Sequence, residues 1–243
     1  MSNTTMMTSS AGLNFQLLRC HRRKRIALQV KNKDIIVKAP YAVPLQYIEN
    51  LVVLKKQWIE NIQSKQQLAT RYQNQLARHG QVWFFGKLTP LIVNEGKRSL
   101  VTVGKHDIVV TLSARKTLSD TTESMRVKKL LEGWFKQQAE VFLTDKMACF
   151  SRQTNLLPNN LYIRQYKARW GCCDNRGHIK LNYLLMMLPE SVIDYVIIHE
   201  LCHLKFLNHS ADFWNLVESF LPDYKMEKRW LKEHQHYLTW TTD

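Results

Sequence analysis

The sequence predicts an α+β protein: an N-terminal antiparallel, β-rich part with one helix, followed by a C-terminal helical part with a small sheet. Two patterns carry this prediction. Up to residue 112, apolar and polar residues alternate through several short stretches, as in strands with one buried face. After residue 113, apolar residues recur every three to four positions, as in helices. We therefore divide the chain into a disordered N-terminus (1–14), a basic β-rich part (15–112) and a helical part (113–243).

The β-rich part begins with the pattern of a hairpin. Residues 15–39 alternate on both sides of the turn-like segment Lys31–Asp34. Two prolines follow, and the apolar positions from Leu45 to about Gln66 then have helical spacing. Strand patterns return further on, with glycines between some of them, at residues 81–85, 89–93, 100–103 and 107–112.

The helical part opens with a long helix over residues 119–153, for which Ser119 is the expected cap. Two strands are expected after it, and Pro189 then occupies a favoured first position of the next helix. Two shorter helices complete the chain. The expected strands are 161–166 and 178–183, and the short helices are 210–220 and 223–236. The sequence shows no internal repeat.

Composition indicates a soluble, cytoplasmic protein. Apolar residues make up 45% and charged residues 23% of the chain, which is ordinary for a globular protein. The five cysteines are scattered, no secretory signal precedes them, and no apolar stretch is long enough to span a membrane. We expect free thiols in a reducing cytoplasm, and no thiolate zinc site at Cys172-Cys173 or Cys202, because a C-x-x-C pair is absent.

Positive charge is concentrated in the first half. The chain carries a net charge of +15, of which residues 1–112 contribute +12. Five of these cations lie close together: Arg19, Arg22, Arg23, Lys24 and Arg25. Such a field favours nucleic acid or another polyanion as a partner of this half. The alternative is a solvated basic face, and no aromatic residues interleave with the cluster to stack on single-stranded bases.

The segment His199-Glu200-Leu201-Cys202-His203 is an H-E-x-x-H motif inside the helix that Pro189 opens. Side chains four residues apart project from the same face of a helix, so two imidazoles can share one tetrahedral zinc ion. Glu200 lies about 100° around the helix from His199, where a carboxylate can reach a metal-bound water as the catalytic base. The motif predicts a zinc-dependent hydrolase. The alternative is a pair of hydrogen-bonded helix histidines without a metal.

A catalytic zinc needs a third protein ligand and one open position. His209 follows the expected end of the helix, where a turn can bring it back over the last helical turn, and it is our first candidate. The alternatives are His234 and His236 on the last helix, and Glu218, which would give the His-His-Glu set of the gluzincins. Three imidazoles would also fit manganese or nickel.

Several ordered blocks around the motif carry a family resemblance. They are Arg169-Trp170-Gly171-Cys172-Cys173, His178–Tyr183, Val192–Tyr195, His199–His203, Asn208-His209-Ser210 and Phe213-Trp214. Together they resemble the YgjP-like metallopeptidase family, relatives of the SprT-like zincins, and the resemblance covers most of residues 15–236. It implies a zincin-like C-terminal part that carries the motif on a helix. It also implies one zinc ion held by His199, His203 and His209, with Glu200 as the base.

This sequence departs from the expected patterns at two positions. The family's block usually reads Arg-Trp-Gly-Ser-Cys, and Cys172 stands here at the position of the serine, which puts a hydroxyl role there in doubt. The ligand spacing equals that of the metzincins, but Phe206 stands where they have glycine. Membership in that clan is therefore not expected, and the turn before His209 must be made differently.

Three further residues are candidates for contacts with the substrate or the oxyanion: Arg169, Tyr195 and Asn182. For Arg169 and Trp170 the alternative is a structural role, with an arginine stacked on an aromatic ring at a strand end. Three functions remain open on the sequence alone. They are a zinc peptidase acting on proteins or peptides, a metal-dependent phosphohydrolase splitting a nucleoside triphosphate into monophosphate and pyrophosphate, and a metal-stabilised nucleic-acid-binding module without catalysis.

Overall fold

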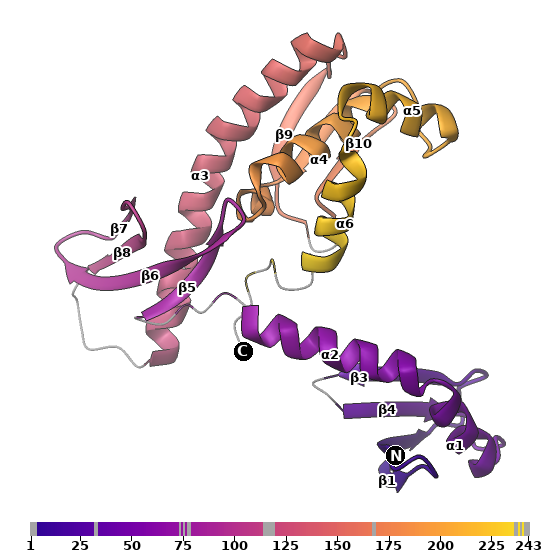
Figure 1. Ribbon diagram of the computed structural model, residues 1–243. Helices are drawn as coiled ribbons and strands as arrows, with labels where there is room; N and C mark the ends of the chain where they lie inside the picture. The colour runs from indigo at the N-terminus through magenta and orange to yellow at the C-terminus, as the bar shows by residue number, and fades with distance from the viewer. Residues whose placement is uncertain are drawn as a thin grey trace. The chain divides into compact units, whose positions relative to one another are not determined.

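The computed structural model describes residues 4–31, 34–72, 74, 76, 79–113, 120–166, 169–235, 238 and 240. It has the predicted mixture of helices and sheets, arranged in two compact units, Met1–Tyr72 and Gln73–Asp243 (Figure 1). The boundary between the units follows the second helix, whereas the sequence patterns suggested a division at residue 112. The strands between residues 79 and 113 therefore belong to the same unit as the C-terminal helices.

The first unit contains a four-stranded sheet in the order β1-β2-β4-β3. Its strands are β1 (Thr4–Thr8), β2 (Asn14–Arg19), β3 (Ala27–Lys31) and β4 (Asp34–Ala39). The antiparallel pairing of β3 with β4 confirms the predicted hairpin. One expectation was wrong: β1 is a strand paired with β2 rather than part of a disordered terminus. The sheet is mainly antiparallel, and its one parallel pair is β2 with β4.

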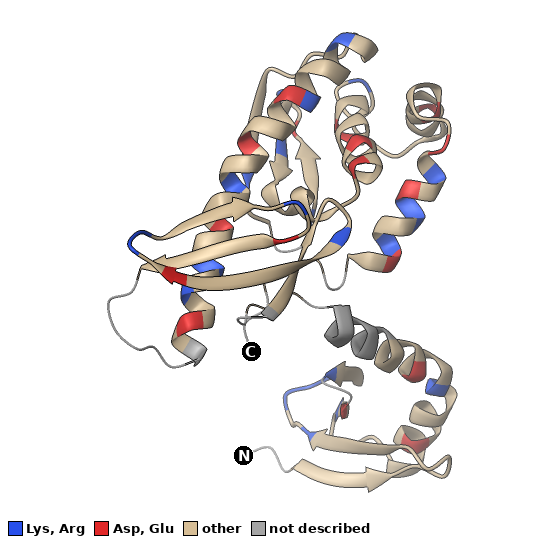
Figure 2. Ribbon diagram, turned by 60° about the vertical axis from the view of Figure 1, so that its left-hand side comes forward, with Lys and Arg blue, Asp and Glu red and all other residues tan. Residues whose placement is uncertain are grey.

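Two helices, α1 (Leu45–Leu54) and α2 (Lys56–Tyr72), replace the single predicted helix. Lys55 interrupts them, and neither proline nor glycine marks the break in the sequence. A core of apolar residues from the strands and both helices holds the unit together: Phe15, Leu17, Ile35, Val37, Ala39, Ile48, Val52 and Ile59. The basic segment predicted to bind polyanions forms the loop between β2 and β3, and Figure 2 shows lysines and arginines gathered along it.

The second unit begins with another four-stranded sheet, in the order β5-β6-β8-β7. Its strands are β5 (His79–Phe84), β6 (Lys87–Gly96), β7 (Leu100–Val103) and β8 (Ile108–Ser113). As in the first unit, two antiparallel hairpins join through a central parallel pair, here β6 and β8. The two sheets thus share one topology, although the sequence shows no repeat.

A long helix, α3 (Asp120–Thr154), runs along the second unit (Figure 1). It confirms the predicted helix, while its proposed cap, Ser119, lies outside the described residues. A three-stranded sheet follows in the order β10-β11-β9, built from β9 (Asn160–Arg164), β10 (Gly171–Cys173) and β11 (His178–Asn182). The short strand β10 was not predicted. Between this sheet and the next helix lies a buried 3-10 turn, η1 (Tyr183–Met187).

Three helices complete the unit: α4 (Glu190–Cys202), α5 (Ala211–Phe220) and α6 (Tyr224–His234). Pro189 precedes α4, as predicted, and the Ser210 hydroxyl caps α5 by accepting a hydrogen bond from Phe213 N. The N-terminal part of α4 is tied to α3 by Lys146, whose Nζ lies 2.6 Å from Glu190 Oε1 and 3.0 Å from Asp194 Oδ1. Within the described residues, no helix combines the length and apolar content needed to cross a membrane.

The β5–β6 turn fixes the start of α4. Phe85 N and Gly86 N donate hydrogen bonds to the carbonyls of Met186 and Met187 in η1. Both turn residues have positive φ, 45° for Phe85 and 75° for Gly86. A Cβ at Gly86 would lie 2.5 Å from Pro189 Cγ and 2.8 Å from Pro189 N, so only glycine allows this approach.

Candidate active site

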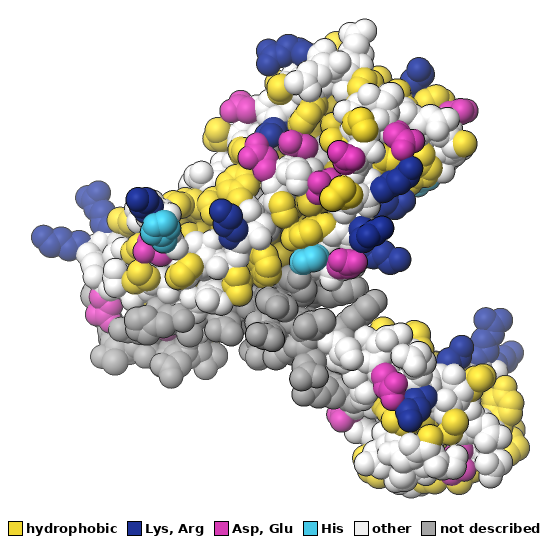
Figure 3. All heavy atoms as spheres, viewed as in Figure 1, with side chains coloured by type: hydrophobic (Ala, Val, Ile, Leu, Met, Phe, Trp, Pro, Cys, Tyr) yellow, Lys and Arg dark blue, Asp and Glu magenta, His cyan; other side chains and the backbone are white. Residues whose placement is uncertain are grey.

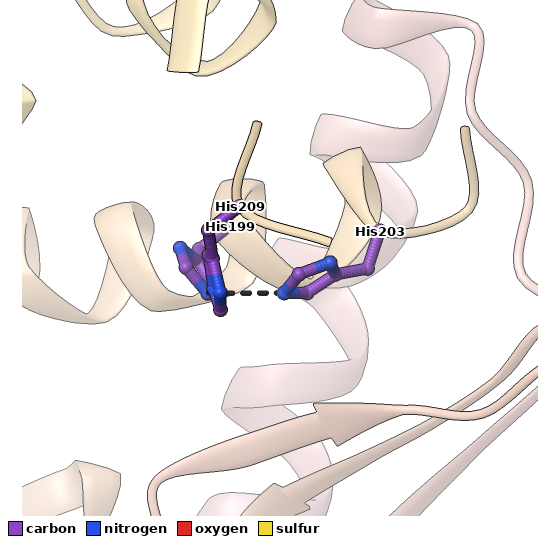
Figure 4. A group of neighbouring side chains, drawn as sticks. All are labelled: His199, His203 and His209. Carbon is purple, nitrogen blue, oxygen red and sulfur yellow. Dashed lines mark hydrogen bonds between the residues drawn. The ribbon is translucent and has the colours of Figure 1, made fainter. Parts of the chain in front are cut away.

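Three imidazoles converge at the C-terminal end of α4 (Figure 4). His199 lies in the last turn of the helix, His203 follows directly as its C-cap residue, and His209 comes from the loop that leads to α5. His199 Nε2 lies 3.2 Å from His203 Nε2 and 3.1 Å from His209 Nε2. Within the described part of the chain, these residues form the one group of three or more potential ligands close enough to share an ion.

The distances fit a metal ion. Zinc binds histidine nitrogens at about 2.0–2.1 Å, so two nitrogens of one tetrahedral site lie about 3.3 Å apart. Hydrogen bonds alone explain the two short distances less well, because one hydrogen on His199 Nε2 can be donated to only one of the two neighbouring nitrogens. A cation shared by three nitrogen lone pairs accounts for the whole arrangement.

The loop after α4 orients His203. Its Nδ1 lies 2.9 Å from the carbonyl oxygen of Phe206, an acceptor that requires a hydrogen on Nδ1 and leaves the Nε2 lone pair free for a metal. The loop continues the helical direction through hydrogen bonds from Lys205 N and Phe206 N to Cys202 O. Among the described residues outside glycine, positive φ occurs at Phe85 and Asn155 alone, so Phe206 makes this turn without the conformation that glycine favours.

The half-buried His199 is held neutral. Burial lowers its pKa to about 3, and the neighbouring His203, His209 and Lys228 act in the same direction. Burial also lowers the pKa of His203. Neutral imidazole is the form that binds a metal. His199 Nδ1 is buried without a hydrogen-bond partner in the structure.

Aromatic rings line the histidine cluster. His203 stacks on Phe213, with ring centroids 4.5 Å apart, and His209 stacks on Trp214 at 5.5 Å. Trp214 in turn stacks on Tyr224. Both Phe213 and Trp214 belong to the block that suggested the family resemblance. Their role in the structure is to restrict the rotation of the imidazoles, which keeps the three nitrogens together.

Glu200 is a buried carboxylate beside this cluster. It is only 5% exposed, and its Oε2 has no hydrogen-bond partner. Burial raises the pKa of Glu200 to about 8, although Arg169 and the backbone N–H of Cys173 both favour the charged form. A buried carboxyl group with one oxygen that lacks a hydrogen-bond partner costs free energy, which makes Glu200 a candidate functional residue.

The edge strand β10 packs directly on this carboxylate. A Cβ at Gly171 would lie 2.7 Å from Glu200 Oε1 and 2.8 Å from Glu200 Cγ, so a side chain at this position would displace the Glu200 carboxylate. Cys173 also faces Glu200, whose charge contributes to a raised pKa of the thiol, about 11, for which burial is the main cause. Cys172 alternates to the other face of the strand, where its Sγ lies 3.9 Å from the Tyr166 hydroxyl.

Two cations lie near the site: Arg169 in the segment before β10, and Lys228 in α6. Arg169 lies close enough to Glu200 to favour its ionised form, and its guanidinium sits over the ring of Tyr166 at 5.7 Å. The stacking expected for this arginine therefore occurs, with Tyr166 as the partner. Lys228 of α6 lies over the Trp214 ring at 3.7 Å, and its positive charge helps to lower the pKa of His199. Lys228 was not a candidate in the sequence, since nothing there links α6 to the motif.

The other two candidate contacts have structural partners. Asn182 is 2% exposed, donates to the carbonyls of Tyr166 and Arg169, and accepts a hydrogen bond from Leu184 N. Its amide is thus fully used within the chain and holds the loop before β10. Tyr195 is 5% exposed and contacts the His199 ring edge-on, at a centroid distance of 5.8 Å. It supports the imidazole by packing.

The alternative third ligands lie elsewhere. His234 stacks on Trp230 and its Nδ1 lies 2.8 Å from Trp230 O. Glu218 accepts a hydrogen bond from Lys225 Nζ at 2.9 Å. His236 is outside the described residues. The histidine that the structure brings to the pair on α4 is therefore His209, as the spacing suggested.

A mixed α+β unit in which three imidazoles converge beside a buried carboxylate is typical of a metal-dependent hydrolase. The chain belongs to the YgjP-like family, whose metallopeptidase domain matches residues 24–234. This match confirms the resemblance deduced from the sequence blocks. The family implies a metal cofactor, for which the three-histidine cluster provides ligands.

Two solved structures are similar to parts of the chain. One is the metallopeptidase zymogen abylysin of Pyrococcus abyssi, with 27% identity over 39% of this chain and 96% of that one, and a TM-score of 0.35. The other is the zymogen jannalysin of Methanocaldococcus jannaschii, with 23% identity over 38% and 93%, and a TM-score of 0.33. Superpositions this limited support no conclusion about the chemistry of this chain. Among curated proteins, none matches the chain.

Proposed function

We propose that this protein is a zinc-dependent metallopeptidase in which His199, His203 and His209 hold one zinc ion and Glu200 is the general base. The observation that carries the proposal is the convergence of three Nε2 atoms beside a buried carboxylate oxygen without a partner. The arrangement is zincin-like: two ligands and the base come from one helix and the third ligand from the loop after it. The five free cysteines suit a reducing cytoplasm, which we propose as its compartment.

In this mechanism each nearby residue has a separate task. When bound by His199, His203 and His209, a zinc ion would supply a Lewis acid for the scissile carbonyl and would lower the pKa of a water toward about 7. Glu200 takes the proton of the attacking water and then delivers it to the leaving amine. The N–H of Cys173 keeps one carboxylate oxygen oriented, and Gly171 sets the position of the side chain. Arg169 supplies the positive charge that stabilises the oxyanion.

A peptide is favoured as the substrate because the site lies beside an open strand edge. In the described sheet, β10 is at an edge and pairs with β11 on one side only. An extended peptide that adds to this edge would make backbone hydrogen bonds with β10 and pass in front of Glu200, which packs on Gly171. Side-chain pockets are not needed for such binding, since the main chain provides the contacts.

A nucleotide phosphohydrolase remains the second candidate, favoured by one observation. Arg169 and Lys228 bring two positive charges to the neighbourhood of Glu200 and His199. Cations in these positions would suit the phosphates of a nucleoside triphosphate as well as an oxyanion. A single panel of substrates separates the two functions.

The experiment measures metal content and turnover in the purified full chain. We expect one zinc per chain, loss of activity with a chelator, and recovery when zinc is returned, with manganese and nickel tested in parallel. Casein and unstructured peptides should be cleaved, whereas nucleoside triphosphates should release no pyrophosphate. His209→Ala should lose zinc, and His106→Ala, an exposed histidine between β7 and β8, should not. Release of pyrophosphate without peptide cleavage would favour the nucleotide hydrolase, and an absence of bound metal would reject both.

A further inference from the structure

The three-stranded sheet has a second face that the proposed chemistry does not use. Side chains alternate across a strand, so Ile179 and Leu181 of β11, both fully buried, face the core together with Gly171, which packs on Glu200 of α4. Lys180 must then face the opposite side, together with its neighbours in register, Tyr162 on β9 and Cys172 on β10. This outer face is separated from the histidine cluster by the sheet itself.

A hollow of about 350 Å³ opens on the outer face. Residues from β9, β11 and the turn between β10 and β11 line it: Tyr162, Arg164, Asp174, Asn175, Arg176, His178 and Lys180. This volume is within the range of sites that hold a nucleotide-sized ligand. Four of the seven residues are basic or can become so, which gives the hollow a strongly polar, cationic lining.

The one acidic residue is already satisfied by the chain. Asp174 Oδ1 accepts hydrogen bonds from the backbone N–H groups of Arg176 and His178, and Oδ2 lies 3.3 Å from Lys180 Nζ. These contacts lower the pKa of Asp174 and shape the β10–β11 turn. The carboxylate therefore neutralises Lys180, and the two exposed arginines, Arg164 and Arg176, give the hollow its excess positive charge.

His178 adds a ring N–H donor. Its Nδ1 lies 3.1 Å from the amide nitrogen of Asn160, which can only donate, so Nδ1 accepts and Nε2 carries the hydrogen. The hollow thus offers N–H groups from His178, two arginines and the Asn175 side chain. N–H donors of this kind, two of them charged guanidinium groups, are suited to phosphate oxygens.

Two tyrosine–arginine pairs extend this surface toward the candidate active site. The Arg164 guanidinium lies over the Tyr162 ring at 5.3 Å, and that of Arg169 lies over the Tyr166 ring at 5.7 Å. Tyr166 belongs to the same face, because its hydroxyl contacts Cys172. The positive charge of Arg169 also acts on Glu200, where it opposes the rise in pKa that burial causes. Aromatic rings and arginine planes on a sheet face are the surfaces on which unpaired bases stack.

The geometry points to a binding site for single-stranded nucleic acid on the outer face of the β10-β11-β9 sheet, with phosphates at Arg164 and Arg176 and bases on Tyr162 and Tyr166. An acidic peptide would find the cations but would leave both rings without stacking partners. A duplex keeps its bases inside and could use the cations alone. Apart from Arg169, the residues of this site have no role in the proposed peptidase activity. The site also differs from the basic loop of the first unit, where no arginine lies over a tyrosine ring among the described residues.

The test measures binding of a fluorescein-labelled 15-nucleotide oligothymidylate to the full-length, zinc-loaded chain by fluorescence anisotropy. Tyr162→Leu removes a stacking ring without changing charge and should weaken binding between fivefold and about 100-fold, whereas Tyr162→Phe should bind as wild type. Arg164→Ala/Arg176→Ala should lower the slope of log affinity against log salt by about 1.4, since each phosphate contact on a single strand contributes about 0.7.

Heparin, a polyanion without bases, provides the control for charge alone. The variant R22A/R23A/K24A/R25A of the first unit should lose affinity for heparin and oligonucleotide alike. Tyr162→Leu should lose affinity for the oligonucleotide only. If Tyr162→Leu and Arg164→Ala/Arg176→Ala both bind the oligonucleotide as wild type, the site is not on this face and the inference is wrong. Equal affinity for a duplex of the same length would also overturn it.

Discussion

Two acidic side chains of α4, the half-buried Asp194 and the buried Glu200, lie in different electrostatic situations. Asp194, in the first half of the helix, has a side chain 22% exposed and lies 3.0 Å from the Lys146 ammonium. Glu200, near the other end, is 5% exposed. Each carboxylate has one oxygen without a hydrogen-bond partner, Asp194 Oδ1 and Glu200 Oε2, but of the two only Asp194 forms a salt bridge among the described residues. Burial raises the pKa of both carboxyl groups. At Asp194 this rise is opposed by direct contact with the Lys146 ammonium, and at Glu200 by the charge of Arg169 and the backbone N–H of Cys173.

This difference separates stability from chemistry on one helix. A half-buried carboxylate with its counterion close by ties α4 to α3, and the chain itself supplies the cation that this carboxylate needs. A buried carboxylate without a salt-bridge partner lowers stability unless something outside the chain completes it. Each end also rests on a glycine that cannot carry a side chain, Gly86 at Pro189 and Gly171 at Glu200. Matched substitutions at both ends of α4 can therefore separate effects on stability from effects on activity.

The largest effect should follow from Glu200→Gln. The amide has nearly the same shape but cannot accept a proton, so we expect kcat/KM for peptides to fall by about 10³-fold while zinc content and Tm stay at wild-type values. Asp194→Asn, the same change at the other end, should keep activity per folded molecule within about threefold. Peptide cleavage, metal analysis and thermal melts measure these quantities. Activity above one tenth of wild type in Glu200→Gln would refute the general-base role.

Gly86→Ala should be the most damaging substitution for folding of the second unit. The new methyl group meets the Pro189 ring and backbone, and a φ of 75° is unfavourable for alanine, so the free energy of unfolding should fall by about 2–4 kcal/mol. Gly177→Ala has a similar φ of 72°, but its nearest Cβ contact is Nδ2 of the exposed Asn159 side chain, at 3.3 Å. It should cost about 1 kcal/mol in urea denaturation. Equal losses would show that the contact with Pro189 is unimportant.

Gly171→Ala should act on activity more than on stability. Its Cβ would lie 2.7 Å from Glu200 Oε1, so the carboxylate must move, and a displacement of this kind costs about 10- to 100-fold in kcat. Zinc content should remain one per chain. Gly133→Ala in α3, where a Cβ meets no atom within 4 Å, is the control and should leave kcat unchanged. A Gly171→Ala enzyme with full kcat would mean that Glu200 needs no fixed position.

Lys146→Met should give the smallest effect, a loss of about 1–2 kcal/mol at pH 7, because it leaves Asp194 without its counterion. In the wild-type protein, burial raises the pKa of Asp194 above the ordinary value of 3.8, and Lys146 limits this rise. Without the lysine the folded-state pKa rises further above the unfolded value. The folded variant then takes up a proton before the unfolded chain as the pH falls, and its deficit should shrink from pH 7 toward pH 4.

Urea denaturation of Lys146→Met at several pH values measures this dependence. Lys129→Met, which removes an exposed lysine elsewhere on α3, should show neither the loss nor the pH dependence. A deficit that stays constant between pH 7 and pH 4 would mean that Asp194 is not the group that responds.

Local sequence patterns were sufficient for the core of the site. Helical periodicity places His199 and His203 on one face, Pro189 marks the start of their helix, and Ser210 caps the next one, which limits where His209 can lie. All of these signals act over a few residues. The structure agrees with the predicted geometry because no distant segment is needed to bring these three imidazoles together.

Pairings between distant segments could not be read in the same way. Alternation shows which residues of β2 or β6 are buried but not that each strand's second neighbour is parallel. The three residues of β10 are too few to show a period. Asn182 looked available for a substrate because its partners, the carbonyls of Tyr166 and Arg169, come from a loop whose path the sequence does not reveal. Lys228 was missed for the same reason.

The described residues near the C-terminus are part of the hydrophobic core. Trp240 is 8% exposed, contacts the Phe135 ring edge-on, and donates a hydrogen bond of 2.9 Å from its indole to the Tyr183 hydroxyl. The match to the family ends at residue 234. An expression clone trimmed to the family boundary would therefore discard an anchor, open a void against α3 and expose the Tyr183 hydroxyl, so preparations intended for crystals or assays should retain the native tail.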